Sequence, residues 1–144
     1  MLIEMTFALA CMSKALYFEA RSESMVGMLA VGQVIMNRVE DKRFPNTVCG
    51  VITDGLRYKN SGRMVKHKCA FSFYCDGKPE TIHNREAYKR SEQLALSILK
   101  GTTLDVTEGA THYHARYTKP YWASAYKRTT CIDTHCFYRW ENKK

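Results

Sequence analysis

The sequence predicts an α+β fold made of a single domain, with a helical N-terminal part and a small antiparallel sheet near the C-terminus. Three observations predict it. Apolar residues recur at helical spacing through most of the first 40 residues and again over residues 85–100. The period changes to two from residue 111 onward. The 144 residues contain no repeat, low-complexity tract or linker that would divide them into domains.

The first two predicted elements are helices separated by a short break. Thr6 is a suitable N-cap for a helix over residues 6–20, whose apolar side chains lie on one stripe. The polar segment 21–24 interrupts this pattern, and Ser24 can cap a second helix over residues 25–39. This second segment is apolar on nearly every face, so we expect it in the middle of the core.

The middle of the chain is less regular. Residues 47–53 can form one or two helical turns. We expect residues 55–83 to lack regular structure, because three glycines and Pro79 interrupt them. A third helix is predicted over residues 85–100, followed by Gly101 as its C-terminal signal.

Two β-like stretches end the chain. In residues 111–117 the side chains alternate, so that His112, His114 and Arg116 share one face and Tyr113 lies on the other. Residues 129–140 form the second stretch. We expect the two stretches to build the small antiparallel sheet.

Composition and charge are those of a globular protein with an anionic partner. Hydrophobic residues make up 45% and charged residues 25%, which excludes a disordered or fibrous chain. The net charge is +8, and the whole excess of basic residues lies after residue 50. Such a charge indicates nucleic acid, anionic lipid or a bacterial wall polymer, without choosing among them.

Neither a membrane span nor an export signal is evident. The most apolar run, residues 25–36, is too short to cross a bilayer and reads as a buried helix. The N-terminus lacks the basic region and cleavage site of a secretory signal. We therefore expect no membrane span and no clear signal peptide.

The six cysteines show no metal-binding spacing. No CxxC pair or zinc-finger pattern occurs, so we expect no structural metal. Six cysteines allow 15 disulfide pairings, and the sequence does not select one. Cys11 lies within a helical apolar pattern and is predicted to be a buried free thiol. The others can form bridges if the protein works outside the cytosol.

Glu19 is the first candidate for chemistry. It lies in the last turn of the first predicted helix, next to Tyr17 and Phe18. The negative end of the helix dipole and apolar neighbours both disfavour its ionised form and raise its pKa, as a general acid near neutral pH requires. The alternative is a surface glutamate paired with Arg21.

The histidines are a second candidate. His112 and His114 share a strand face, and His135 could complete the ligand set of a zinc-dependent amidase. No HExxH or other local zinc signature supports this hypothesis. The alternative is a set of polar histidines that line a cleft, and we expect no metal and no cofactor.

The third candidate is the aromatic-rich segment 69–77. With Ser72 and Asp76, it could stack on sugar rings and hydrogen-bond to their hydroxyl groups. It could equally be a loop held down by its aromatic residues and a disulfide. The sequence shows no GxSxG elbow and no Ser/His/Asp triad.

Six short motifs, taken together and in order, resemble the germination-type cell wall hydrolases. This is the family of the spore-cortex-lytic enzyme catalytic domain, and it also occurs in bacterial genomes and phages. The matching segments are residues 16–23, 27–39, 44–52, 69–77, 109–115 and 135–139. The resemblance implies a lysozyme-like fold that cleaves peptidoglycan glycan strands, with the glutamate of the YFEAR motif, here Glu19, as the catalytic residue. Ser22 stands where the family usually has glycine, which puts the geometry of that turn in question.

The expected activity is therefore that of a lytic transglycosylase or a muramidase-type glycosidase. A conventional hydrolase needs a second carboxylate, for which Glu23 and Asp76 are candidates. The resemblance favours a lytic transglycosylase, in which Glu19 acts alone as acid and then as base. We expect six residues to line the substrate groove: Phe71, Ser72, Asp76, His112, Tyr113 and His114.

Two other functions stay open at this point. One is a zinc-dependent N-acetylmuramoyl amidase, and the other is a non-enzymatic basic nucleic-acid-binding protein, although no nucleic-acid-binding motif accompanies the charge. We expect a monomer whose partner is bacterial peptidoglycan, with no specific nucleic acid. A single basic catalytic domain over residues 1–144 suggests a phage or prophage endolysin. Such an enzyme would be made in the host cytoplasm and released to act on the wall, in the periplasm or outside the cell.

Overall fold

The computed structural model describes residues 2–141. Its elements in chain order are α1 (Leu2–Ala20), α2 (Met25–Glu40), α3 (Val48–Ile52), β1 (Gly55–Arg57), β2 (Met64–Cys69), η1 (Ser72–Cys75), α4 (Arg85–Leu99), β3 (His112–Ala115), η2 (Tyr121–Ser124), β4 (Lys127–Ile132) and β5 (His135–Arg139). Helices thus precede a three-stranded antiparallel sheet, which confirms the predicted α+β class.

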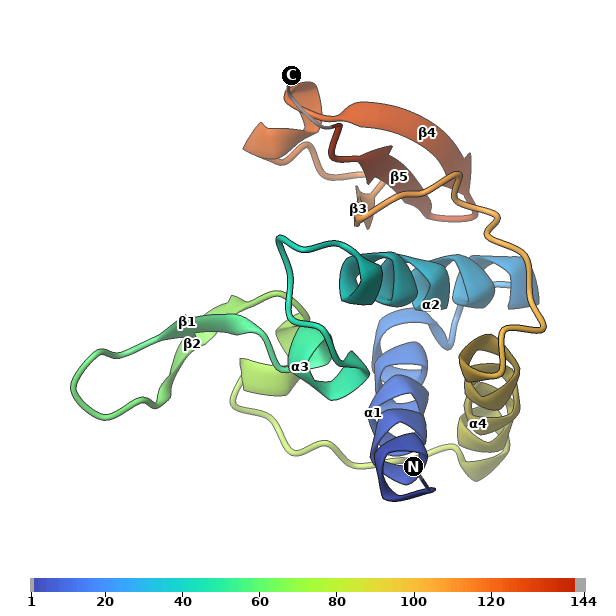
Figure 1. The fold of residues 1–144 in the computed structure, drawn as a ribbon, viewed down its shortest axis with the longest axis horizontal. Helices are drawn as coiled ribbons and strands as arrows, with labels where there is room; N and C mark the ends of the chain where they lie inside the picture. The colour runs from blue at the N-terminus through green and yellow to red at the C-terminus, as the bar shows by residue number, and fades with distance from the viewer. Residues whose placement is uncertain (1, 142–144) are drawn as a thin grey trace.

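Helix α2 lies between two parts of the molecule, with the C-terminal sheet on one side and α1, α3 and α4 on the other (Figure 1). Met28, Val31 and Ile35 belong to the core shared with the other helices. Ala30 and Val34 belong to a second cluster, which includes Phe137 and Ala110 of the sheet side. Because two of its faces are covered, the apolar pattern of this helix is explained beyond its exposed first residues, Met25 and Val26, and its central position is confirmed.

The boundaries of three helices agree closely with the predictions. Ser24 caps α2 by accepting a hydrogen bond from the Gly27 amide at 3.2 Å. Thr47 caps the short helix α3 in the same way. Helix α4 ends one residue before Lys100, and Gly101 follows with a φ of 73°, which glycine adopts without strain. No helix in residues 2–141 is long and apolar enough to cross a membrane.

Helix α1 differs from the prediction in two ways. It begins at Leu2 and not near Thr6, because residues 2–5 continue the helix as an extra turn. Its Cys11 is not a free thiol, since it forms a disulfide with Cys49 of α3. The prediction for Cys11 was wrong because its partner is 38 residues away and reaches it only when α3 packs against α1.

The segment predicted to be irregular contains an antiparallel hairpin. Strands β1 and β2 extend from the helical body as a long ribbon (Figure 1), and the Cys69–Cys75 disulfide joins the end of β2 to η1. All three residues of β1 are exposed. An exposed ribbon needs no alternation of apolar and polar side chains, so the periodicity gave no signal.

The C-terminal sheet has the strand order β3-β5-β4. The predicted stretch 129–140 is in fact two strands joined by a tight turn, at which Asp133 has a φ of 51°. A disulfide between Cys131 and Cys136 links the two strands. The register places Tyr113 opposite Phe137, so Tyr113 faces the helices and the adjacent histidines face away.

Candidate active site

Glu19 lies in the last turn of α1, half-buried, and is bonded to a residue from the far end of the chain. The hydroxyl of Tyr113 in β3 donates a hydrogen bond of 2.5 Å to Oε1 of Glu19. Burial raises the pKa of the Glu19 carboxyl, and the Tyr113 hydrogen bond opposes this shift without cancelling it. A raised pKa keeps a carboxyl available as a proton donor, which a general acid requires.

Arg21 does not pair with Glu19. Its guanidinium donates a hydrogen bond of 2.5 Å to the Tyr17 hydroxyl and lies 4.8 Å from the centre of that ring. The Tyr17 hydroxyl in turn accepts hydrogen bonds from the amides of His83 and Asn84, at 3.2 and 3.1 Å. Arg21 therefore contributes to fixing the end of α1 against the start of α4, and the Glu19 carboxyl is left to Tyr113.

Tyr113 is held in place by the sheet. Its ring packs 4.8 Å from that of His135 and 5.7 Å from that of Phe137. Burial, with Glu19 nearby, raises the pKa of Tyr113 well above its ordinary value of 10.0. The phenol therefore stays protonated at neutral pH and acts as a permanent donor to Glu19.

A pocket of about 580 Å³ adjoins this pair, because Tyr113 is among its walls. The lining residues are Arg38, Phe44, Asp54, Ala70, His112, Tyr113, Tyr121, Trp122, Ala125 and Tyr126. Aromatic faces with a few polar groups between them suit the alternating apolar and hydroxyl-bearing faces of sugar rings. The site is thus an aromatic pocket whose wall carries the hydrogen-bond donor to Glu19.

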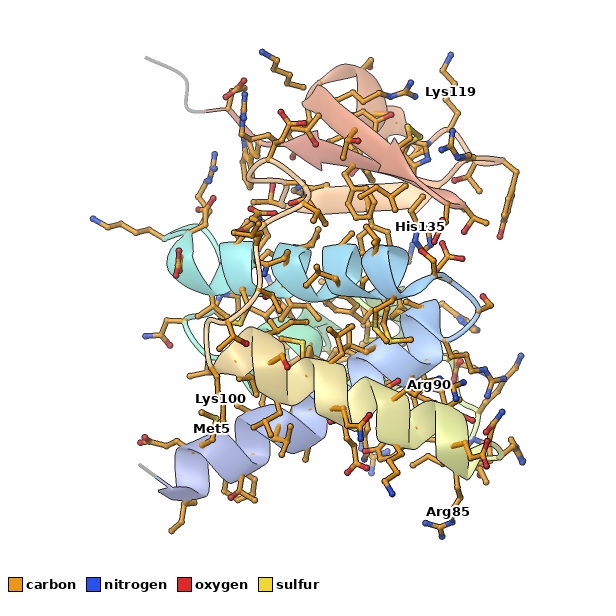
Figure 2. The ribbon with its side chains drawn as sticks, turned by 90° about the vertical axis from the view of Figure 1, so that its right-hand side faces the viewer. Met5, Arg85, Arg90, Lys100, Lys119 and His135 are labelled. Atoms are coloured by element: carbon orange, nitrogen blue, oxygen red, sulfur yellow. A yellow bond between two sulfur atoms is a disulfide. The ribbon has the colours of Figure 1, made fainter. Side chains whose placement is uncertain are left out.

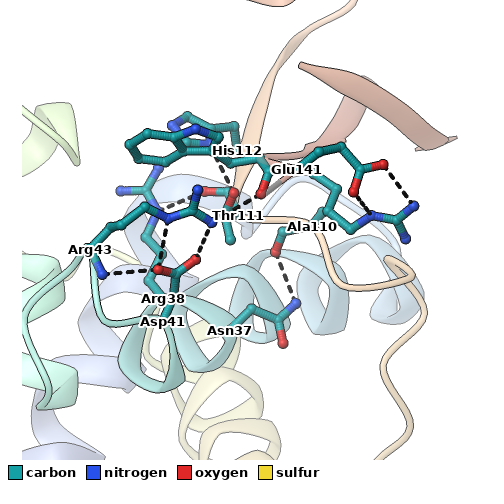
Figure 3. A network of polar contacts seen from close by, with 10 residues as sticks. Asn37, Arg38, Asp41, Arg43, Ala110, Thr111, His112 and Glu141 are labelled. Carbon is teal, nitrogen blue, oxygen red and sulfur yellow. Dashed lines mark hydrogen bonds and ion pairs between the residues drawn. The ribbon is translucent and has the colours of Figure 1, made fainter. Parts of the chain in front are cut away.

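His112 lies among aromatic rings in this pocket. Its ring centre is 5.2 Å from that of Trp122 and 4.6 Å from that of Tyr126. Burial, followed by the positive charges of Arg38 and Arg43, lowers the pKa of His112 to about 4, so it is neutral near pH 7. The close-up in Figure 3 shows His112 above the network in which Arg38 donates to the Thr111 carbonyl, at 2.7 Å.

The other histidines do not join His112 in a metal site. His114 shares the outer face of β3, whereas His135 lies on the opposite face, between the sheet and α2 (Figure 2). Across residues 2–141, no three or more His, Cys, Asp or Glu side chains are placed to hold a metal ion together. The ligand set of the amidase hypothesis is therefore divided between two faces of the sheet.

The two candidate second carboxylates are engaged elsewhere. Oε1 of Glu23 accepts hydrogen bonds from the Thr134 hydroxyl at 2.6 Å and the Thr134 amide at 3.2 Å. It also lies 3.2 Å from Nδ1 of His135, outside the geometry of a hydrogen bond. Oδ1 of Asp76 accepts from the Lys78 amide at 2.9 Å. No contact found among the described residues joins either carboxylate to Glu19.

Residues of the segment 69–77 differ in their environment. Phe71 is only 1% exposed and belongs to the core, so it cannot offer a ring face to a sugar as we expected. Its contact with the site is indirect, through the Arg38 guanidinium 5.7 Å from its ring centre. Ser72 is exposed at the start of η1, and Asp76 is half-buried at its end.

Several pocket residues were missed in the sequence. Arg38 and Phe44 lie inside the matching motifs, but nothing in their spacing marked them as pocket residues. Trp122 and Tyr126 lie between β3 and β4, outside every motif. The concentration of aromatic residues in 121–126 was the sequence signal that could have indicated them. Their position over His112 depends on the fold of the sheet.

Together, the helices around α1, the glutamate at its end and the sheet packed across α2 define a lysozyme-like α+β domain with one candidate acid. This chain belongs to the Cell Wall Hydrolase family, whose model matches residues 22–138. The match includes Tyr113 and the pocket residues, and it begins three residues after Glu19.

Sequence relatives are spore cortex-lytic enzymes. That of Halalkalibacterium halodurans is 34% identical over 102 residues, which are 71% of this chain and 25% of that protein. That of Bacillus cereus is 54% identical over 41 residues, 28% of this chain and 16% of that protein. The matched part of this chain spans a quarter or less of the length of these relatives.

Two solved structures share the fold over nearly the whole chain. One is the catalytic domain of the germination-specific lytic transglycosylase SleB from Bacillus anthracis, with a TM-score of 0.69 and 28% identity, covering 92% of this chain and 93% of that one. The other is the catalytic domain of SleB from Bacillus cereus, with a TM-score of 0.64 and 28% identity, covering 92% and 89%. The predicted family and lysozyme-like fold are confirmed.

Proposed function

We propose that this chain cleaves the glycan strands of bacterial peptidoglycan as a lytic transglycosylase, with Glu19 as acid and then base. The observation that carries the proposal is the half-buried Glu19 carboxyl, with its raised pKa, bonded to Tyr113 beside the aromatic pocket. The SleB domain of Bacillus anthracis, which has the same fold, is described as a lytic transglycosylase.

In the first step, Glu19 protonates the glycosidic oxygen of the leaving sugar as the bond from that oxygen to the anomeric carbon breaks. Tyr113 donates to Oε1, so the proton that is transferred belongs on Oε2. Neutral Glu19 is favoured by burial before the step, and the Tyr113 hydrogen bond stabilises the carboxylate that the step leaves behind.

In the second step, the 6-hydroxyl of the muramic sugar attacks its own anomeric carbon. A bond forms between that oxygen and the anomeric carbon, and the hydroxyl proton passes to the Glu19 carboxylate. The carboxyl is thus restored to its protonated state without water. The product ends in 1,6-anhydro-muramic acid.

The surroundings of Glu23 and Asp76 favour this reaction over hydrolysis. A muramidase of the usual kind requires a second carboxylate that acts as nucleophile or base. Glu23 is bonded to Thr134, and Asp76 is bonded to the Lys78 amide. Among the three carboxylates that the sequence singled out, Glu19 is thus the one left for the chemistry, and Asp54 in the pocket wall accepts from the Gly55 amide at 3.0 Å.

The pocket is proposed to bind the sugars. His112 and Tyr113 line it directly, whereas His114 lies in the neighbouring pocket on the outer face of β3. Ser72 and Asp76 stay predictions as groove residues, and of the two only Ser72 is exposed. Phe71 acts through Arg38 in this proposal and does not touch the substrate.

The proposed place of action is the bacterial wall, in the periplasm or outside the cell. All six cysteines are paired in disulfides, which persist in oxidising compartments and are rare in the cytosol. A monomer, a single catalytic domain over residues 1–144, and an endolysin made in the host cytoplasm and released for lysis stay predictions. So does the absence of a specific nucleic-acid partner.

Mass spectrometry of fragments released from purified sacculi tests the proposal. We expect terminal sugars one water lighter than the reducing form, and therefore not reducible by borohydride. Predominantly reducing ends in fresh digests would make the enzyme a muramidase. Release of stem peptides from intact glycan would make the enzyme an amidase, if a chelator abolished that release and zinc restored it.

A further inference from the structure

A second pocket, of about 560 Å³, lies on the outer face of the C-terminal sheet. Its walls include His114, Arg116, Lys119, Tyr126, Arg128 and Tyr138. Three of these are cationic, and none of these described residues is acidic. The pocket therefore carries a local excess of positive charge.

Among the described residues, two of the three cations have no acidic partner to neutralise them. The Nε atom of Arg116 donates to the Asp133 carbonyl at 2.5 Å, so this guanidinium is tied to the β4–β5 turn. Within residues 2–141, no carboxylate lies at ion-pair distance from Lys119 or Arg128. Both side chains are exposed, and their charges are available to an anionic ligand.

The floor of the pocket is fixed by a chain of hydrogen bonds. Nδ1 of His114 lies 2.7 Å from the Ala115 carbonyl, which can only accept, so Nδ1 carries a proton. In the neutral imidazole, Nε2 then accepts from the Tyr138 hydroxyl at 2.9 Å. The hydroxyl oxygen of Tyr138 in turn faces Nη2 of Arg128 at 3.3 Å. Arg128 is thereby oriented across the floor without losing its charge.

This pocket shares part of its wall with the proposed sugar pocket. Tyr126 lines both of them. The ring of Trp122 lies 5.2 Å from His112 in the first pocket and 5.7 Å from His114 in the second. A ligand in the first pocket with a branch that passes Tyr126 would enter the second pocket, which Lys119 and Arg128 line.

We propose that this second pocket binds a free carboxylate of the peptide stem carried by the glycan strand. The inference rests on the proposed function, because it assumes that the sugars of the same strand occupy the first pocket. Peptide stems are attached to the muramic sugars themselves, so their carboxylates lie beside the glycan. Two uncompensated cations form the charge-assisted contacts that a carboxylate seeks. The pocket thereby favours strands that keep their stems over bare glycan.

Phosphodiester wall polymers offer a similar oxyanion, so the test separates the two sources. Sacculi are stripped of phosphodiester polymers and divided in two, and in one half the stem carboxylates are converted to neutral methylamides. Binding is measured by co-sedimentation with the Glu19→Gln protein, so that cleavage plays no part. In that background, K119Q/R128Q is compared with R90Q/K100Q, which removes the same two charges near α4, away from Lys119 (Figure 2). Thermal unfolding of both variants shows that each is folded.

On native stripped sacculi, we expect K119Q/R128Q to bind about tenfold more weakly than R90Q/K100Q, or about 1.4 kcal/mol. On methylamidated sacculi we expect the two variants to bind equally. Equal binding on native stripped sacculi would overturn the proposal, as would the same tenfold difference on both kinds. A difference that appears only when phosphodiester polymers are retained would assign the pocket to them and also overturn it. Release of anhydro-ended fragments by the unmodified protein is scored separately, so a failure of the proposed function is seen independently.

Discussion

Glu19, at the end of α1, and Glu23, in the α1–α2 turn, lie four residues apart, yet their carboxylates have different hydrogen-bond partners. Glu19 is bonded through one oxygen to Tyr113, a neutral donor beside a pocket. Glu23 has a side chain only 4% exposed and accepts two hydrogen bonds from Thr134. A carboxyl bonded to one neutral donor in a pocket wall can move protons, whereas one that accepts from the amide and the hydroxyl of another segment holds two segments together.

The end of α1 at Ala20 creates this difference. Beyond it, the turn is fastened to the sheet: Asp133 accepts from the Ser24 amide at 2.8 Å and from the Ser24 hydroxyl at 2.6 Å. Glu23 makes the parallel contact to Thr134. These contacts hold the sheet against the helices, and Tyr113, which belongs to the sheet, thereby lies next to Glu19. Glu23 thus supports the position of Glu19, the proposed acid.

The largest expected effect is on Glu19 itself. Glu19→Gln keeps the shape of the side chain and its bond to Tyr113, but it removes the transferable proton. We expect wall lysis to fall by at least about two orders of magnitude, the usual contribution of a general acid. Turbidity loss of sacculi measures it, with thermal unfolding as the control for folding. Lysis close to that of the unmodified protein would remove Glu19 from the mechanism.

The second effect should appear in stability and not in chemistry. Glu23→Ala leaves the Thr134 amide and hydroxyl without their acceptor, and we expect a loss of about 2–3 kcal/mol in the free energy of unfolding. Urea unfolding measures it, and Glu23→Gln, which keeps an acceptor oxygen, should recover part of the loss. Activity per folded molecule should stay within about threefold. A Glu23→Gln protein that is fully stable but as inactive as Glu19→Gln would show that Glu23 is the second carboxylate after all.

The third test changes the hydrogen bonding of Glu19 without substituting Glu19 itself. Tyr113→Phe removes the hydrogen bond that lowers the pKa of Glu19, so that pKa should rise further. Because the acid form is needed, the alkaline limb of the pH–activity profile should move to higher pH, with lysis at its optimum reduced about tenfold. The profile of kcat/KM from pH 4 to 9 measures both. A limb that moves to lower pH, or does not move, would contradict the assigned role of Tyr113.

The smallest effect concerns His135, which lies against Glu23. Burial lowers the pKa of His135 below its ordinary value of 6.5, and the negative charge of Glu23 opposes that shift. The unfolded chain therefore binds more protons than the folded one below about pH 6.5, and this histidine costs stability as the pH falls from there. Glu23→Gln should lower the pKa of His135 further and enlarge the loss. Histidine NMR titration of both proteins checks the direction, and a rise in that pKa would be the contrary result.

Elements with strong local patterns could be predicted from the sequence. The stripe of α4, the all-round apolar surface of α2 and the Ser24 cap each depend on neighbours within a few residues, so they were visible without the fold. The β1–β2 hairpin was not visible, because strands that bury no face show no alternation. The start of α1 was missed because residues 2–5 extend the helix beyond the predicted cap.

By itself, the sequence determined the α+β class and most helix boundaries, and through the YFEAR motif it led to the prediction that Glu19 is the catalytic residue. Only the tertiary structure decided that Tyr113, 94 residues away, is its partner, that Cys11 pairs with Cys49, and that Phe71 is buried. Periodicity and capping act over one or two turns of chain, so they can be read along it. The choice of a long-range partner is made by which surfaces pack together, and that depends on all the elements at once.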